Sequence, residues 1–226
     1  MSLLTIIAPG HMNENNEVEF KETALFYLSA IPNLHRYILV NNSKHVAQFD
    51  VDDERFIYIN DRSAFSKIPS VGEANLIDNI LESSNDELFM KVHARCPIVN
   101  INHFIQAIDL GKLSDFYCIL RKNLIADLFG KYPSRCYVDT RILIFKGSFG
   151  KALFKWVKGR YNSNLSNGMI EHEVFNYLCL QEFDNVTFFS SLPKMVGTSG
   201  HGRNYNSLRS RMRHLLAQMM FKLGLS

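Results

Sequence analysis

The chain has 226 residues, of which 46% are hydrophobic and 12% aromatic, so it can bury one sizeable core and is not an intrinsically disordered protein. Its formal net charge of +3 is small, and basic side chains do not interleave with aromatic ones, so nucleic acid is not an expected partner. No segment reaches the roughly 18 apolar residues of a membrane-spanning helix. The four cysteines are widely spaced without a CxxC pair, which favours a cytoplasmic protein with reduced thiols and no zinc site.

The charges are unevenly distributed along the chain. Residues 194–226 contain six Lys or Arg and no Asp or Glu, whereas residues 1–193 contain slightly more acidic than basic side chains. We therefore expect a catalytic domain over residues 1–193. Residues 194–226 form a basic tail, which either belongs to that domain or associates with a membrane.

Short apolar segments alternate with helical patterns in the first part of the chain. Residues 3–8 predict a buried strand, and residues 18–31 place apolar side chains at helical spacing. Residues 36–43 and 55–60 predict two further strands. The order strand, helix, strand is typical of the right-handed βαβ unit of an α/β protein.

The next helix has a recognisable start. Ser70 is a candidate N-cap and Glu73 follows three residues later, which together make a capping box. Further along, the patterns predict strands and helices in alternation: strands over residues 88–95, 115–121 and 137–145, and helices over residues 102–108, 124–129, 148–158 and 168–182. The predicted fold is a mostly parallel, Rossmann-like sheet with helices on both faces.

In open sheets of this kind, ligands bind beyond the carboxyl ends of the strands. The rule brings together the ends of four predicted strands: Ala8 and Pro9, Asn42, Arg95, and residues 139–141.

The strand within "LFMKVHARCP" has an unusual polar face. Lys91, His93 and Arg95 lie on one side at a period of two. The apolar side chains of Met90, Val92 and Ala94 lie on the other side. The cationic side is either a solvated sheet face or a site that holds an anion.

The motifs "VGEANLIDNIL", "FMKVHARCPIVN", "YVDTRILIF" and "GMIEHEVFNYL", in this order, resemble those of small GT-A-type glycosyltransferases from bacterial surface-polysaccharide clusters. The resemblance covers roughly residues 3–180. It implies a GT-A-like fold and transfer of a sugar from a nucleotide-diphosphate donor, with a UDP-sugar favoured, to a surface glycan or a lipid-linked acceptor.

Such enzymes usually carry an Asp-x-Asp motif after the strand that here reads "MKVHARC", where it holds a divalent metal against the donor diphosphate. The chain has no such motif at that place, and Asn42 stands where many relatives have Asp. We therefore expect no cofactor, with Lys91 and Arg95 supplying the positive charge that the leaving diphosphate requires. The alternative is a bound Mn²⁺ or Mg²⁺, held by Asp139 with Glu171 or Glu173.

Two carboxylates are candidates for the base that deprotonates the acceptor. Glu171 matches the acidic position of the resembled family better than Glu173, although both could also be first-turn residues favoured by the helix dipole. The expected donor-binding residues lie near strand ends and loops: Ala8, Pro9, Asn42, Gly72, Glu73, Asn75, Lys91, Arg95, Asp139, Arg141 and Arg203. Alternatively, Glu73 caps its helix, and Asp139 and Arg141 form an ion pair with each other. Arg203 could also belong to a glycine-rich connector to the tail that binds no ligand.

The tail predicts an amphipathic helix. Its apolar side chains fall within one arc of about 100°: Leu208, Met212, Leu215, Leu216, Met219, Met220 and Leu223. Cations flank this arc, so the helix is expected to lie on the anionic inner leaflet, beside a lipid-linked acceptor. The alternative is a helix packed on the protein body.

Two other functional classes remain open. The missing Asp-x-Asp is compatible with a non-catalytic nucleotide-sugar-binding or scaffold protein of the same fold. A nucleotidyltransferase or phosphotransferase is the third possibility.

Overall fold

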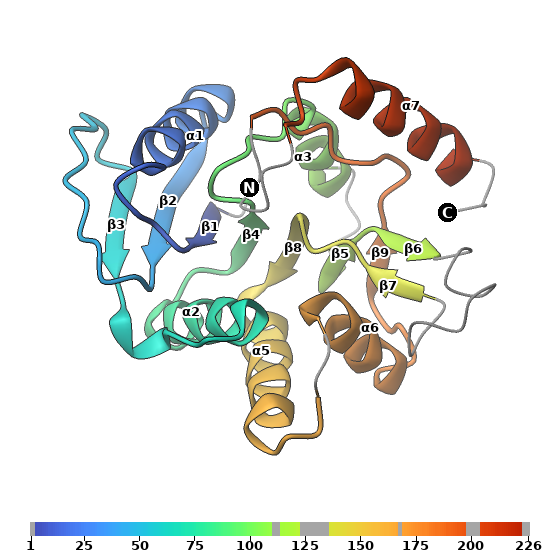
Figure 1. The fold of residues 1–226 in the computed structure, drawn as a ribbon. Helices are drawn as coiled ribbons and strands as arrows, with labels where there is room; N and C mark the ends of the chain where they lie inside the picture. The colour runs from blue at the N-terminus through green and yellow to red at the C-terminus, as the bar shows by residue number, and fades with distance from the viewer. Residues whose placement is uncertain (1–2, 110–113, 123–135, 167–168, 198–203, 223–226) are drawn as a thin grey trace.

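The computed structural model describes residues 3–109, 114–122, 136–166, 169–197 and 204–222. A seven-stranded sheet lies at the centre (Figure 1). Its strands run in the order β3 (Phe56–Asn60), β2 (Leu34–Asn41), β1 (Leu4–Gly10), β4 (Leu88–Val92), β8 (Ile142–Lys146), β5 (Phe116–Cys118) and β9 (Val186–Phe188). Only β8 is antiparallel to its neighbours in this sheet, which confirms the predicted mostly parallel α/β fold.

Helices cover both faces of the sheet (Figure 1). On one face lie α1 (Glu17–Ala30) and α3 (Ile101–Asp109), with α7 (Leu208–Lys222) beyond α3. On the other face lie α2 (Pro69–Ser83), α5 (Gly147–Asn162) and α6 (Ile170–Leu180). No helix in the described ranges is long and apolar enough to cross a membrane.

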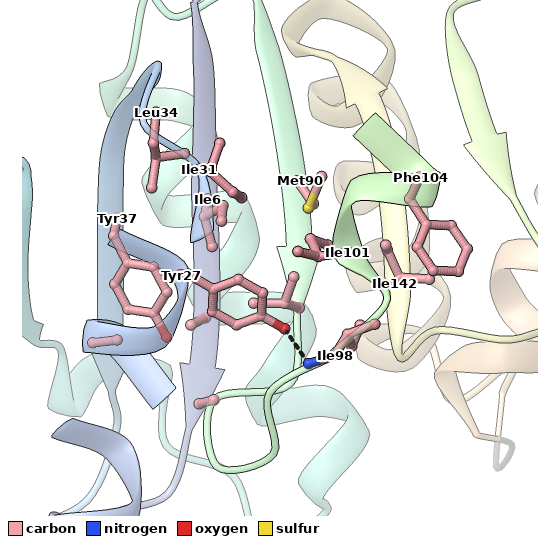
Figure 2. Packing of buried hydrophobic residues seen from close by; sticks show 14 of the residues in the cluster. Ile6, Tyr27, Ile31, Leu34, Tyr37, Met90, Ile98, Ile101, Phe104 and Ile142 are labelled. Atoms are coloured by element: carbon pink, nitrogen blue, oxygen red, sulfur yellow. Dashed lines mark hydrogen bonds between the residues drawn. The ribbon is translucent and has the colours of Figure 1, made fainter. Parts of the chain in front are cut away.

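The alternation of side chains along each strand divides the core into two clusters. In β4, Met90 belongs to the cluster under α1 and Phe89 to the cluster under α2 and α5. Figure 2 shows the first cluster, in which the fully buried Tyr27 of α1 accepts a hydrogen bond from the backbone N–H of Ile98 (3.0 Å). This bond ties α1 to the segment that follows β4.

Two predicted strands are broken in the structure. The segment 115–121 forms β5 and then β6 (Leu120–Lys122), and the segment 137–145 forms β7 (Cys136–Val138) and β8. Because β6 and β7 pair with each other in a separate two-stranded sheet, the chain leaves the main sheet after β5 and re-enters it at β8. Strand β9 was not predicted, and the predicted helix over residues 124–129 lies outside the described residues.

The predicted capping box at Ser70 is wrong. Helix α2 begins at Pro69 with Ile68 as its N-cap, and no side chain caps it. Proline is favoured at this first position because its fixed φ suits the helix and it has no N–H to leave unsatisfied. Ser70 instead bonds the hydroxyl of Tyr161, and Glu73 pairs with Lys91.

Candidate active site

A pocket of about 370 Å³ opens at the carboxyl ends of β1 and β2, beside the start of α2. This is where ligands bind in open α/β sheets. Three elements and the loops between them supply its lining: Pro9, Gly10, His11, Asn42, Phe65, Ser66, Lys67, Pro69, Glu73 and Leu76. The structure therefore brings together Pro9, Asn42 and Glu73, three of the predicted donor-binding residues.

Asn42 is held in a fixed position at the base of this pocket. It is 8% exposed, and its Oδ1 lies 3.0 Å from Nδ1 of His11. The start of α2 approaches closely because residue 72 is glycine: a Cβ at this position would lie 2.8 Å from Nδ2 of Asn42. Gly72 therefore sets the distance between α2 and the amide that faces the ligand.

We predict that Gly72→Ala weakens nucleotide binding several-fold without lowering stability. The new methyl group displaces the Asn42 amide, while alanine in place of glycine stabilises a helix by about 0.5–1 kcal/mol. The measurements are UDP titration calorimetry and urea denaturation. Gly159→Ala is the matched control, because a Cβ at this helical glycine meets nothing within 4 Å. Equal UDP affinity in the two variants would contradict the role given to Gly72.

Glu73 joins the pocket to the centre of the sheet. Its Oε1 lies 2.5 Å from Nζ of Lys91, which is 4% exposed and also donates to the backbone carbonyl of Thr140 (2.5 Å). The Glu73 side chain remains 28% exposed. One edge of the carboxylate thus neutralises a buried lysine, while the residue itself lines the pocket.

The predicted cationic face of β4 is not formed. The strand ends at Val92, so the alternation stops before Arg95, whose guanidinium bonds Glu19 of α1 through Nε (2.6 Å) on the opposite face of the sheet. Lys91 and Arg95 therefore point to different faces, and each is paired with a carboxylate.

His93 lies between these charges. The pKa of His93 is lowered to about 4. Burial is the main cause, and the positive charges of Lys91, Arg141 and Arg95 act in the same direction, whereas the charge of Glu73 opposes them. Its Nδ1 is buried and finds no hydrogen-bond partner among the described residues. The imidazole is therefore neutral at neutral pH.

Asp139 and Arg141 lie on the turn between β7 and β8 and not on a continuous strand. The Asp139 carboxylate accepts from the backbone N–H of Arg141 (3.2 Å) and from its Nε (2.8 Å), which stabilises the turn and breaks the predicted strand. Arg121 of β6 lies 3.6 Å from the same carboxylate. Burial alone would raise the pKa of Asp139, but Arg141 and Arg121 outweigh it and hold the pKa below its usual value.

The two candidate bases have different surroundings at the start of α6. Glu173 is 3% exposed and accepts from Nε of Arg160 (2.7 Å) and from Oγ of Ser166 (2.5 Å). Glu171 is half-buried, and the described residues give it neither a hydrogen bond nor an ion pair. As far as the described residues show, Glu171 is the one of these two carboxylates whose oxygens are free to receive a proton.

Tyr161 of α5 bonds the start of α2 and lies within the electrostatic influence of the carboxylates at the start of α6. Its hydroxyl bonds Ser70 at the start of α2, and its pKa is raised by burial and by the charges of Glu173, Glu171 and Glu73. The first turns of α2 and α6 therefore converge on one tyrosine. This places Glu171 on the same side of the sheet as the pocket.

The other predicted residues are placed as follows. Ala8 is fully buried within β1, Asn75 is half-buried on α2 and does not line the pocket, and Arg203 lies outside the described residues. Sequence reasoning missed His11 and Lys67 as lining residues, although His11 directly follows a strand end and the ligand rule could have indicated it. No signal in the sequence indicated that Tyr161 would join α2 to α6.

Within the described ranges, no group of three or more His, Cys, Asp or Glu side chains is placed to hold a metal ion. The Asp139 oxygens contact two guanidinium groups, and Glu173 is bonded to Arg160 and Ser166.

Neither family models nor curated protein sequences match this chain. Solved structures do resemble it. A 4-diphosphocytidyl-2C-methyl-D-erythritol synthase from Anaerococcus prevotii covers 99% of this chain and 96% of its own (TM-score 0.54, 12% identity). A putative glucose-1-phosphate thymidylyltransferase from Bacillus anthracis covers 96% of both chains (0.55, 11%), and a glycosyltransferase involved in glycosylating the major capsid of PBCV-1 covers 84% and 83% (0.53, 13%). The chain thus has the α/β fold of these nucleotidyltransferases and this glycosyltransferase.

Proposed function

We propose that the protein is a glycosyltransferase that moves a sugar from a nucleotide-diphosphate donor, with a UDP-sugar favoured, to a glycan or lipid-linked acceptor. The observation that carries the proposal is the position of Glu171: a half-buried carboxylate with no partner among the described residues, on the first turn of α6 and on the same face of the sheet as α2, which borders the pocket. A free carboxylate beside a donor pocket is what deprotonation of an acceptor hydroxyl requires.

The pocket residues have distinct roles in this proposal. The Glu73 carboxylate accepts hydrogen bonds from donor hydroxyl groups while Lys91 fixes its orientation. Lys67 and the N-terminal end of α2, where the helix dipole is positive, face the negative charge of the diphosphate. Glu171 takes the proton from the acceptor.

Nucleotidyl transfer is the second candidate, because the similar structures include a 4-diphosphocytidyl-2C-methyl-D-erythritol synthase and a putative glucose-1-phosphate thymidylyltransferase. In that reaction a nucleoside triphosphate binds and pyrophosphate leaves, so more negative charge must be neutralised than for a diphosphate. Of the described residues that line the pocket, Lys67 alone is a Lys or Arg, and Glu73 is acidic. This charge distribution favours the nucleotide-diphosphate donor.

The test is a reaction panel with product analysis. The protein is incubated with UDP- and GDP-sugars, and separately with nucleoside triphosphates and sugar phosphates. We expect release of nucleoside diphosphate in the first set, and its loss in Glu171→Gln. Pyrophosphate release in the second set would establish nucleotidyl transfer instead, and binding without turnover would support the non-catalytic alternative.

Metal dependence is measured in the same assay. We expect transfer to persist in EDTA and to gain little from Mn²⁺ or Mg²⁺, because Lys67 and the α2 first turn face the diphosphate. Complete loss of transfer in EDTA, with recovery on adding either ion, would contradict metal-independent transfer.

The proposed acceptor is lipid-linked because α7 exposes an apolar face. Six of its large apolar side chains are 41% to 75% exposed: Leu208, Met212, Leu215, Leu216, Met219 and Met220. The helix contacts the body through other residues, including Ala217, Phe221 and Gln218, whose Oε1 accepts from the N–H of Leu192 (2.9 Å). Because cations flank the exposed face and acidic residues are absent from 194–226, an anionic leaflet is the complementary surface.

We predict that the protein floats with anionic liposomes and that Met212→Gln, Leu216→Gln and Met219→Gln together abolish flotation. Each change removes exposed apolar area that would enter the interface, without touching the packed side of α7. The control is Val18→Gln with Leu25→Gln, which removes exposed apolar side chains from α1. Absence of flotation by the parent protein would reject the membrane role.

A further inference from the structure

A second cavity, of about 780 Å³, lies between α7 and the segment that precedes it. It is strongly cationic: five fixed positive charges and one histidine line it, namely Arg121, Arg141, Lys194, Arg211, Arg213 and His214. No Asp or Glu of the described residues lines it. The cavity is separate from the pocket at β1 and β2, with which it shares no lining residue.

The charges in this cavity are largely uncompensated. Asp139 is the carboxylate that Arg121 and Arg141 share, and the described part of the chain supplies no carboxylate to Lys194, Arg211 or Arg213. Nε of Arg121 is buried without a hydrogen-bond partner in the described ranges. Arg121 and Arg141 are half-buried, and Lys194, Arg211 and Arg213 are exposed, so the cavity is a solvent-accessible region of positive potential that attracts anions.

The behaviour of His214 agrees with a positive potential in the cavity. Burial and the charges of Arg141, Lys194 and Arg121 lower its pKa. The cavity therefore already disfavours one more positive charge.

The cavity adjoins the candidate active site through one short turn. Arg141 lines the cavity, while the carbonyl of its neighbour Thr140 accepts from Lys91, the partner of Glu73 in the donor pocket. On the same side, the ring centre of Tyr137 lies 5.9 Å from the guanidinium carbon of Arg121 and 5.9 Å from the ring centre of His172. The first turn of α6, which carries His172 and Glu171, therefore lies close to a residue that lines the cavity.

We propose that this cavity binds the phosphate or diphosphate group of an anionic acceptor, which holds the acceptor hydroxyl toward Glu171. Guanidinium groups suit this ligand because they form bidentate, charge-assisted hydrogen bonds with phosphate oxygens. The role of this ligand as the acceptor depends on the proposed glycosyl transfer. The phosphate site itself is inferred from the cavity alone.

The test uses inorganic pyrophosphate as the probe, titrated calorimetrically at low salt into the full chain saturated with UDP. Arg211→Gln with Arg213→Gln is expected to weaken pyrophosphate binding at least about tenfold, the scale of losing charge-assisted contacts. The matched control is Arg209→Gln with Lys222→Gln, which removes the same charge from exposed positions of α7 that do not line the cavity. The control is expected to bind almost as the parent does.

Three results would overturn the proposal. One is an equal loss in the two double variants, which would reflect net charge only. Another is competition between UDP and pyrophosphate, which would place both in one pocket. The third is binding of phosphatidic acid vesicles without binding of pyrophosphate, which would assign the cavity to lipid headgroups. Because titration needs no turnover, failure of the transfer assay would leave this result standing, and the reverse also holds.

Discussion

Replacing Glu171 with glutamine is expected to lower turnover at least about a hundredfold, the usual contribution of a general base, while UDP affinity stays nearly intact. Glutamine keeps the shape of the side chain but cannot accept a proton. Because Glu171 is half-buried and unpaired in the described structure, the variant should lose less than about 1 kcal/mol of stability, the scale of a first-turn charge on a helix dipole. Single-turnover kinetics and thermal denaturation check the two halves of this prediction.

Glu173→Gln is the matched control two residues away. Its carboxylate is buried against Arg160 and Ser166, so its loss should lower stability more than turnover per folded molecule. If Glu171→Gln turns over normally and Glu173→Gln does not, the roles assigned to the two carboxylates are reversed.

The second large effect is on stability, at the pair formed by Glu73 and Lys91. Glu73→Gln is expected to cost about 2–3 kcal/mol, because it leaves a lysine that is 4% exposed without its counter-charge. This is at the lower end of the range for buried pairs, since Glu73 is itself 28% exposed. Glu73 also lines the proposed donor pocket, so we expect UDP-sugar affinity to fall with stability.

A double-mutant cycle measures the pair. Adding Lys91→Met to Glu73→Gln removes the stranded charge, so the double variant should lose less stability in urea denaturation than the two single variants predict together. Asp115→Asn provides the surface comparison: its partner Lys146 is 35% exposed, and the change should cost less than about 1 kcal/mol. Additive losses at Glu73 and Lys91 would show that the pair is not energetically coupled.

The sequence was most informative where short-range patterns decide structure. Buried apolar runs such as residues 3–8 and helical spacing over residues 18–31 are local properties, and β1 and α1 formed as predicted. The ligand rule then located Pro9 and Asn42 at one pocket, because it depends only on where parallel strands end, but Arg95 and residues 139–141, which the rule also placed there, do not line this pocket.

Tertiary partners decided what the sequence could not. Strand β4 ends one residue before His93, so a period of two that continued to Arg95 assigned that residue to the wrong face. Asp139 bonds its own neighbour Arg141 and breaks a segment with strong β propensity. Glu73 pairs with Lys91, which is 18 positions away in the sequence. A capping rule considers only residues within one helical turn, so it could not predict this pair.

The basic cavity was also beyond local patterns. Arg121 and Arg213 are far apart in sequence and line one cavity, because α7 lies on the side of the molecule where β6 and β7 form their two-stranded sheet (Figure 1). Arg141, expected at the donor, lines this cavity instead.

A crystal structure with bound UDP tests the central claim most directly. We expect the nucleotide to occupy the pocket lined by Pro9, Asn42 and Glu73, with its diphosphate toward Lys67 and the first turn of α2. Glu171 would then lie on the open side of the diphosphate, where the acceptor enters. UDP bound in the cationic cavity beneath α7, with the pocket at β1 and β2 empty, would contradict the assignment of the donor site and the roles derived from it.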